Sequence, residues 1–194
     1  VVPYPPGGAT DSAARLMAQS LTEALGQPFT VENKPGVGGM LALEQVANAP
    51  ADGYTLLVAS TGPAAISPLL YKNRNFDPLA SLEGIISFAS APGIIVVRNG
   101  LKANSIKELL DISEQKPNGL TMASAGSGSF QHLLGMHFQS SVGVKWTHIP
   151  FKGSAPALTE IAGDRVDVMI DVVPSAAPLI KAGRMRALAV TTPR

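Results

Sequence analysis

The stretch Leu120–Leu134, which reads LTMASAGSGSFQHLL, carries the pattern that decides the fold. Its apolar start predicts a buried strand over residues 120–123, and the glycine- and serine-rich turn 124–129 breaks that strand. The apolar residues behind the turn recur at helical spacing and predict a helix that begins directly after it. A strand, a tight turn and a helix in this order are half of a βαβ unit.

The same order of elements occurs twice along the chain. Residues 1–59 and residues 120–173 each predict a strand, turn, helix, strand, turn, helix and strand. The glycine-bearing turns at matching places are 5–10 and 33–39 in the first copy, and 124–129 and 150–154 in the second. The repetition predicts an α/β fold in two lobes, with a mainly parallel sheet and helices on both faces.

Individual segments carry further expectations. The unbroken apolar run Tyr54–Ala59 predicts a buried strand, with Tyr54 in a core, and Phe29–Val31 predicts a shorter strand. Ser105–Glu108 has the pattern of a capping box and therefore predicts the start of a helix. Trp146 is most simply a core residue.

The composition excludes several classes of function. The chain has 194 residues, 45% of them hydrophobic, a net charge of +1 and no cysteine. Because no run or stripe of Lys and Arg occurs, we expect neither a nucleic-acid partner nor an electrostatic membrane anchor. The lack of cysteine excludes disulfides, thiolate metal sites and a Cys nucleophile. No apolar run approaches about 18 residues, so we expect no insertion into a membrane.

The two strongest turns, 5–11 and 124–129, have the chemistry of an anion site. Ligands of open α/β sheets bind outside the carboxyl ends of the strands, where the N–H groups of a helix N-terminus lack intrahelical partners. Neither turn contains Lys or Arg, which favours a carboxylate held by neutral donors, with the hydroxyls of Thr10, Ser127 and Ser129 helping. Two facing turns would suit a molecule with a carboxylate at each end.

Simpler interpretations of these residues stay open. The glycines can serve only to make tight turns, and Asp11 can cap its helix instead of binding ligand. Asp171 can accept a hydrogen bond from a ligand amine or from water, or it can cap a turn. His132 and His137 lie five apart on a helix and make a poor metal pair, so we expect His132 to shape the turn and no metal site.

Sharper catalytic and nucleotide motifs are incomplete. The turn 7–10 lacks the Lys of a phosphate loop. Gly126 and Gly128 begin a dinucleotide fingerprint, but Gln131 occupies the place of its third glycine. No Gly-x-Ser-x-Gly elbow is present.

Five motifs together resemble one known family. They are VVPYPPGGATD at 1–11, VENKPGVGG at 31–39, DGYTLL at 52–57, SAGSGSFQHL at 124–133 and FKGSAPA at 151–157. Their sequence and order are similar to those of the tripartite tricarboxylate transporter receptors, the Bug family of periplasmic binding proteins.

This resemblance implies a fold like that of type II periplasmic binding proteins, with two α/β lobes and a ligand cleft between them. It implies residues 1–90 with the extreme C-terminus 190–194 as lobe one, and residues 91–189 as lobe two. Family members continue beyond the position of Arg194, so lobe one is expected to be incomplete in this chain.

The resemblance further implies an extracytoplasmic solute receptor in the periplasm, exported by a signal peptide that this sequence does not contain. The implied ligand is a small carboxylate: a di- or tricarboxylate, an acidic amino acid or an aromatic acid. The implied partners are membrane subunits of a tripartite tricarboxylate-type transporter, and neither catalysis nor a cofactor is expected.

The turns and the resemblance together give a set of expected ligand-binding residues. In the first lobe these are Pro6, Gly7, Gly8, Ala9, Thr10, Asp11, Gly39, Ser60 and Thr61. In the second lobe they are Ser124, Ala125, Gly126, Ser127, Gly128, Ser129, Gly153, Ser154 and Asp171.

Two other classes of function compete with this expectation. One is a metabolite-sensing effector domain of a regulator. The other is a transferase on an α/β fold, which would need a base within hydrogen-bond reach of Ser127 or Ser129.

Overall fold

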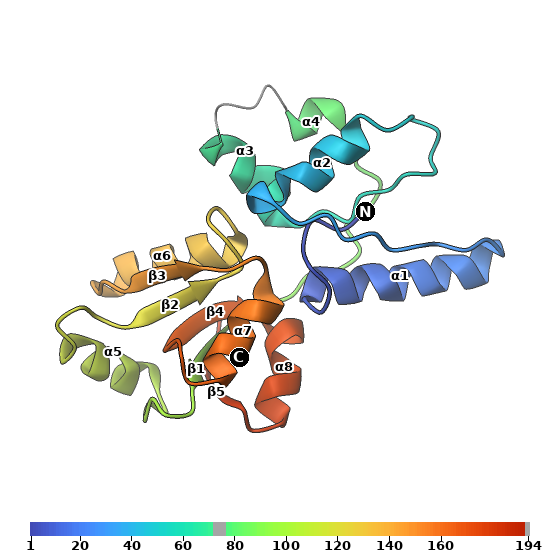
Figure 1. Cartoon of the computed structure of the whole chain (residues 1–194). Helices are drawn as coiled ribbons and strands as arrows, with labels where there is room; N and C mark the ends of the chain where they lie inside the picture. The colour runs from blue at the N-terminus through green and yellow to red at the C-terminus, as the bar shows by residue number, and fades with distance from the viewer. Residues whose placement is uncertain (72–76, 193–194) are drawn as a thin grey trace. The chain divides into compact units, whose positions relative to one another are not determined.

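The computed structural model describes residues 1–71 and 77–192, and the chain divides into two units, Val1–Ser90 and Ala91–Arg194 (Figure 1). Residues 193–194, part of the C-terminal segment that we expected with lobe one, lie outside the described residues. Within the described part, no helix is both long enough and apolar enough to span a bilayer.

The second unit is built on a five-stranded sheet with the order β3-β2-β4-β1-β5. Its strands are β1 Gly93–Arg98, β2 Thr121–Ser124, β3 Thr147–Pro150, β4 Val168–Val172 and β5 Met185–Val190. Strand β2 pairs in parallel with β3 and β4, whereas β1 pairs antiparallel with β4 and β5.

The prediction of a mainly parallel sheet is therefore wrong for half of these pairings. Strands β2, β3, β4 and β5 share one direction, as crossover helices require. Strand β1 does not follow a crossover helix of this unit. It lies reversed between β4 and β5, with Ile94 opposite both Asp171 and Val190.

The helices of this unit begin and end where the sequence signals them. They are α5 Ile106–Glu114, α6 Phe130–Val142, α7 Ser154–Ala162 and α8 Val173–Lys181. The predicted start of α5 is confirmed, because the Glu108 amide donates to Ser105 Oγ at 3.2 Å. The Glu108 carboxylate accepts from the Asn104 amide instead of that of Ser105. Gly143 ends α6 in the left-handed conformation that glycine favours.

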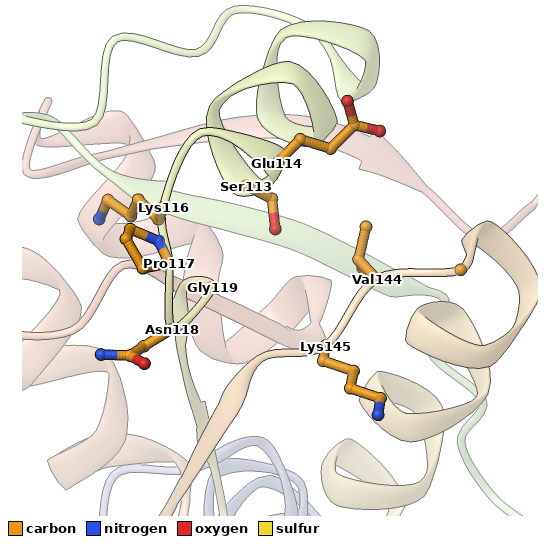
Figure 2. Close-up of a pocket in the computed structure, with 9 residues that line it drawn as sticks. Ser113, Glu114, Lys116, Pro117, Asn118, Gly119, Val144 and Lys145 are labelled. Atoms are coloured by element: carbon orange, nitrogen blue, oxygen red, sulfur yellow. The ribbon is translucent and has the colours of Figure 1, made fainter.

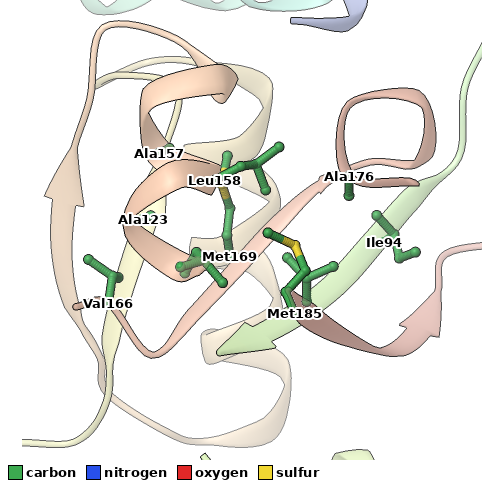
Figure 3. Packing of buried hydrophobic residues seen from close by; sticks show 10 residues of the cluster. Ile94, Ala123, Ala157, Leu158, Val166, Met169, Ala176 and Met185 are labelled. Atoms are coloured by element: carbon green, nitrogen blue, oxygen red, sulfur yellow. The ribbon is translucent and has the colours of Figure 1, made fainter. Parts of the chain in front are cut away.

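Two hydrophobic cores cover the two faces of the sheet, because successive strand residues point to opposite sides. Ile94 and Val96 of β1 belong to the core under α7 and α8, where Leu158 and Ala176 are buried (Figure 3). The opposite core contains Trp146, which is 7% exposed. The prediction that Trp146 is a core residue is confirmed, and its Nε1 donates to Ser113 Oγ at 2.8 Å.

The first unit consists mainly of helices. They are α1 Ala9–Leu25, the 3-10 turn η1 Val37–Gly39, α2 Met40–Ala47, the π-helical turn η2 Gly62–Ile66, α3 Ser67–Leu70 and α4 Pro78–Ser81. Its buried side chains include Val2, Met40 and Leu43.

The strands predicted over residues 29–31 and 54–59 are absent from the described part of this unit. An isolated bridge joins Val2 to Asn33. Residues 54–59 make two hydrogen bonds with Val1: the Val58 amide donates to the Val1 carbonyl, and the Val1 amino group donates to the Leu56 carbonyl. A strand needs a neighbour that supplies a ladder of hydrogen bonds, and two bonds to a single residue do not make a ladder. The core interpretation of Tyr54 is also wrong, since this side chain is 92% exposed.

We therefore expect the backbone amides of residues 54–59 to exchange with solvent at least about 100-fold faster than those of β1 and β4. The reason is that β1 is paired on both sides, whereas residues 54–59 have no ladder. Hydrogen exchange followed by mass spectrometry tests this, and equal protection of the two regions would contradict it.

Candidate functional site

The turn Ser124–Ser129, which we call the β2–α6 turn, leads from the carboxyl end of β2 into α6. Ser129 is the N-cap, and its Oγ accepts from the His132 amide at 3.2 Å. Gly126 and Gly128 have φ values of 129° and 78°, and a Cβ on Gly126 would lie 3.2 Å from the Phe151 carbonyl oxygen. These two glycines are thus required by the backbone path itself, whatever else they do.

Two stacked histidines contact the residues of this turn. The rings of His132 and His148 lie 4.0 Å apart between centroids and are inclined by 16°. His132 Nδ1 accepts from the Gly128 amide at 3.2 Å, which confirms the prediction that His132 shapes the turn. Burial lowers the pKa of His132, and burial together with the charge of His132 lowers the pKa of His148 to about 4. Both rings are therefore neutral at neutral pH.

His148 Nε2 also lies 2.7 Å from Ser124 Oγ. This is a serine–histidine contact, but Ser124 is 0% exposed and its Oγ also accepts from the Gly126 amide. No carboxylate is hydrogen-bonded to His148 in the described part of the chain. The Ser124–His148 pair therefore stabilises the turn and does not present an exposed nucleophile.

Asp171 accepts hydrogen bonds from the first turns of two helices, α6 and α7. It lies near the carboxyl end of β4 and is 0% exposed. Its Oδ1 accepts from Gln131 Nε2 at 2.9 Å, Ser154 Oγ at 3.0 Å and the Val172 amide at 2.8 Å. Its Oδ2 is buried and has no hydrogen-bond partner among the described residues.

This environment raises the pKa of Asp171. Burial is the dominant cause, and the hydrogen bonds from Gln131, Val172 and Ser154 oppose it without cancelling it. Sequence reasoning did not include Gln131 in the site. Its polar side chain in the first turn of a helix that follows a glycine turn was the available signal.

The first turns of α6 and α7 thus meet at one carboxylate. Parallel strands place their carboxyl ends at the same edge of a sheet. Strand β2 therefore brings the N-terminus of α6 to this edge, β3 brings that of α7, and β4 brings Asp171. Gly153, buried and with φ of 120°, precedes Ser154, the first residue of α7. Helix N-termini offer outward N–H groups and a favourable dipole, which together suit an anion.

In the first unit, Asp11 holds the turn 5–10. Its Oδ2 accepts from the Gly7 amide and from Arg15 Nε, both at 3.0 Å, and its Oδ1 accepts from Asn33 Nδ2 at 2.8 Å. Burial raises the pKa of Asp11, but the bonds from Arg15, Gly7 and Asn33 outweigh it and lower the pKa below its usual value. Both carboxylate oxygens are engaged by protein donors, but the prediction that Asp11 caps its helix is wrong, because Gly8 is the N-cap and no side chain makes a capping hydrogen bond there.

Asn33 was missed by sequence reasoning. Its Nδ2 also donates to the Tyr4 carbonyl at 2.9 Å, so it ties the second glycine turn to the first. Helix α1 itself begins at Ala9, directly after Gly8, and no side chain caps its N-terminus. Gly7 has a φ of 93°, a conformation that few other residues adopt.

Of the other candidates of the first unit, Gly39 and Ser60 have structural partners. Gly39 is buried with φ of 92°, and a Cβ there would lie 2.7 Å from the Pro63 Cβ and 3.0 Å from the Pro3 Cβ. Ser60 hydrogen-bonds the phenol of the half-buried Tyr4. Thr61 is exposed at the start of η2.

A surface hollow of about 420 Å³ lies at the other end of β2 and contains none of the expected ligand-binding residues (Figure 2). Its lining consists of Ser113, Glu114, Lys116, Pro117, Asn118, Gly119, Gly143, Val144 and Lys145. Among the described residues, no group of His, Asp and Glu has the arrangement of a metal site.

Comparison with known proteins gives a consistent result. A family model described as the tripartite tricarboxylate transporter family receptor matches residues 13–194. Protein BugT of Bordetella pertussis is 36% identical over 191 residues, which are 98% of this chain and 59% of that protein. A UPF0065 protein from the tcbD-tcbE intergenic region of Pseudomonas sp. strain P51 is 36% identical over 99% of this chain and 57% of its own length.

Solved structures agree with the sequence relatives. Rpa4515 of R. palustris with adipate superposes with a TM-score of 0.96 at 38% identity, and periplasmic binding protein BugD with 0.87 at 36%. MatC from Rhodopseudomonas palustris with bound malate gives 0.91 at 30% identity. This chain covers 98% to 100% of its own length in these matches but only 64% or 65% of the other chains.

Proposed function

Because this chain belongs to the family of tripartite tricarboxylate transporter receptors, we propose that the whole protein is a periplasmic solute receptor for a small carboxylate. It passes this ligand to the membrane subunits of a tripartite tricarboxylate-type transporter. The family consists of solute-binding receptors and not of enzymes, and accordingly we propose no catalytic step.

The observation that carries this proposal is the meeting of two helix N-termini at the carboxyl edge of the sheet. Phe130 and Gln131 begin α6 and Ser154 begins α7, and the amides of a first helical turn have no partner inside their own helix. Charge-assisted hydrogen bonds contribute roughly 1.5–3 kcal/mol each, so three or four of them can reach the roughly 8 kcal/mol of micromolar binding after ordering costs.

We propose a dicarboxylate as the ligand class. Two related proteins of known structure carry adipate and malate, both dicarboxylates. The β2–α6 turn, Gly153 and Ser154 would hold one carboxylate. The contribution of Pro6, Gly7, Gly8, Ala9, Thr10 and of Ser60 and Thr61 to ligand binding stays a prediction.

A thermal-shift and calorimetry panel on the whole protein tests the proposal. We expect adipate or malate at about 100-fold excess over Kd to add about 2.7 kcal/mol of stability and to raise Tm by several degrees. The matched control is 1,6-hexanediol, which has the length of adipate without its charges and should leave Tm unchanged. If dicarboxylates, acidic amino acids and aromatic acids all fail to shift Tm, the proposed function is wrong.

A further inference from the structure

The two carboxylate oxygens of Asp171 have opposite surroundings. Oδ1 is saturated by donors from Gln131, Ser154 and Val172. Oδ2 is buried and has no partner in the described part of the chain. An ionised carboxylate spreads its charge over both oxygens, so this arrangement leaves half of the charge without compensation.

Among the described residues, no cation acts on the pKa of Asp171, and Lys152 in the turn before α7 is exposed. On α6 the nearest titratable side chain is His132, which is kept neutral by burial and accepts a bond from Gly128. Glu160 and Lys181 lie in the last turns of α7 and α8, far along each helix from Asp171's partners in the first turns. Strand β1 places Ile94 opposite Asp171, with its only charged residue, Arg98, at the far end of the strand.

Asp167 on the same segment shows the contrast. Four residues earlier in the chain, its carboxylate accepts from Arg98 Nε at 2.8 Å and from Lys116 Nζ at 3.3 Å. The negative charge of Asp167 is therefore balanced by cations. Asp171 instead has neutral hydrogen-bond donors, and they all bond to its Oδ1. The fold thus gives these two buried carboxyl groups different partners, cations for Asp167 and neutral donors for Asp171.

We propose that Asp171 takes up one proton from solvent, on Oδ2, when a carboxylate ligand binds at the first turns of α6 and α7. This inference rests on the proposed function. A bound anion close to an ionised, unbalanced carboxylate is repelled, and a proton on Oδ2 removes that repulsion. The protonated Oδ2 is also a hydrogen-bond donor, which can bond a ligand oxygen or an ordered water.

The coupling between ligand binding and protonation of Asp171 predicts the direction in which affinity changes with pH. Ligand affinity should fall by up to tenfold per pH unit as the pH rises between the pKa of Asp171 in the free protein and its pKa in the complex. A site made of neutral amides and hydroxyls alone would show no such decline once the ligand is fully ionised.

Calorimetry of adipate and malate binding to the whole protein measures the proton directly. Titrations in buffers of different ionisation enthalpy, from about pH 5 to about pH 9, should show uptake that peaks near one proton per ligand. Asp171→Asn keeps the Oδ1 acceptor and removes the titration. It should show no uptake, and at high pH it should bind more tightly than the wild type. A merely structural role would instead weaken binding at every pH.

Carboxyl ¹³C NMR measures the titration of the Asp171 carboxyl group directly. The Asp171 signal, assigned by its loss in Asp171→Asn, should titrate above the usual range for Asp and move higher when ligand is added. Ser154→Ala removes a donor that favours the ionised form and should move the titration higher still. Asp111→Asn, at an exposed residue of α5, is the control that should change neither measurement.

The outcomes separate the two proposals. If a carboxylate binds without proton uptake, or if Asp171→Asn keeps the uptake, the coupling is wrong and the receptor function stands. If no carboxylate binds, the receptor function and the coupling are both wrong.

Discussion

Gly119→Ala is expected to destabilise the protein by about 3 kcal/mol, one of the two largest effects of a single substitution that the structure predicts. Gly119 has a φ of 66°, where a non-glycine residue costs roughly 1–2 kcal/mol. A Cβ there would also lie 2.0 Å from the Lys145 carbonyl oxygen. That oxygen belongs to the backbone leading into β3, so it cannot move aside without disturbing the β2–β3 pairing.

Gly143→Ala is the matched control. Gly143 also has a positive φ, 74°, but nothing lies within 4 Å of a Cβ at this position. It should lose only about 1 kcal/mol, the cost of the left-handed conformation. Urea denaturation followed by circular dichroism measures both variants, and equal losses would show that the close approach of Lys145 to Gly119 carries no energetic weight.

Asp167→Ala is expected to cost about 3 kcal/mol at neutral pH. The Asp167 carboxylate, only 10% exposed, accepts from Arg98 Nε and from both the amide and the hydroxyl of Thr121. Removing it leaves the Arg98 guanidinium with its longer 3.8 Å contact to the exposed Asp164, and leaves the Thr121 backbone N–H without its acceptor. Lys116 is 38% exposed, so its pair with Asp167 contributes little to this figure.

The effect of Asp167→Ala should depend on pH with a known sign. Burial would raise the pKa of Asp167, but the bonds from Thr121 and Arg98 and the charge of Lys116 lower it below its usual value. Because the folded-state pKa lies below the unfolded value of about 3.9, the stabilisation is present above that pH and is lost as the pH falls through the folded pKa. The gap between wild type and variant should thus be constant from neutral pH down to about pH 5 and should narrow below about pH 4.

Urea denaturation at neutral and acidic pH measures this gap. Asp111→Ala serves as the control, because Asp111 is exposed and its ion pair is with the exposed Lys107, so its loss should stay within about 0.5 kcal/mol. A gap for Asp167→Ala that widens in acid would contradict the assignment.

The candidate site was predictable only in part. Glycine turns between strands and helices are local signals, so Ser129 as N-cap of α6 and Gly153 before α7 could be expected from residues near each other in the chain. The contacts of Gln131 and Ser154 with Asp171 span 40 and 17 residues. These contacts depend on how β2 pairs with β3 and with β4, which no local pattern encodes.

The linear order of residues by itself determined where the helices and strands of the second unit lie, which residues cap them, and that Trp146 is buried. These depend on periodicity and on capping, which act over a few residues. Tertiary structure alone decided the reversed direction of β1, the missing strand at residues 54–59 and the uneven surroundings of Asp171. Strand pairing and the balance of a buried charge are set by partners distant in the chain, and that is why only the folded molecule fixes them.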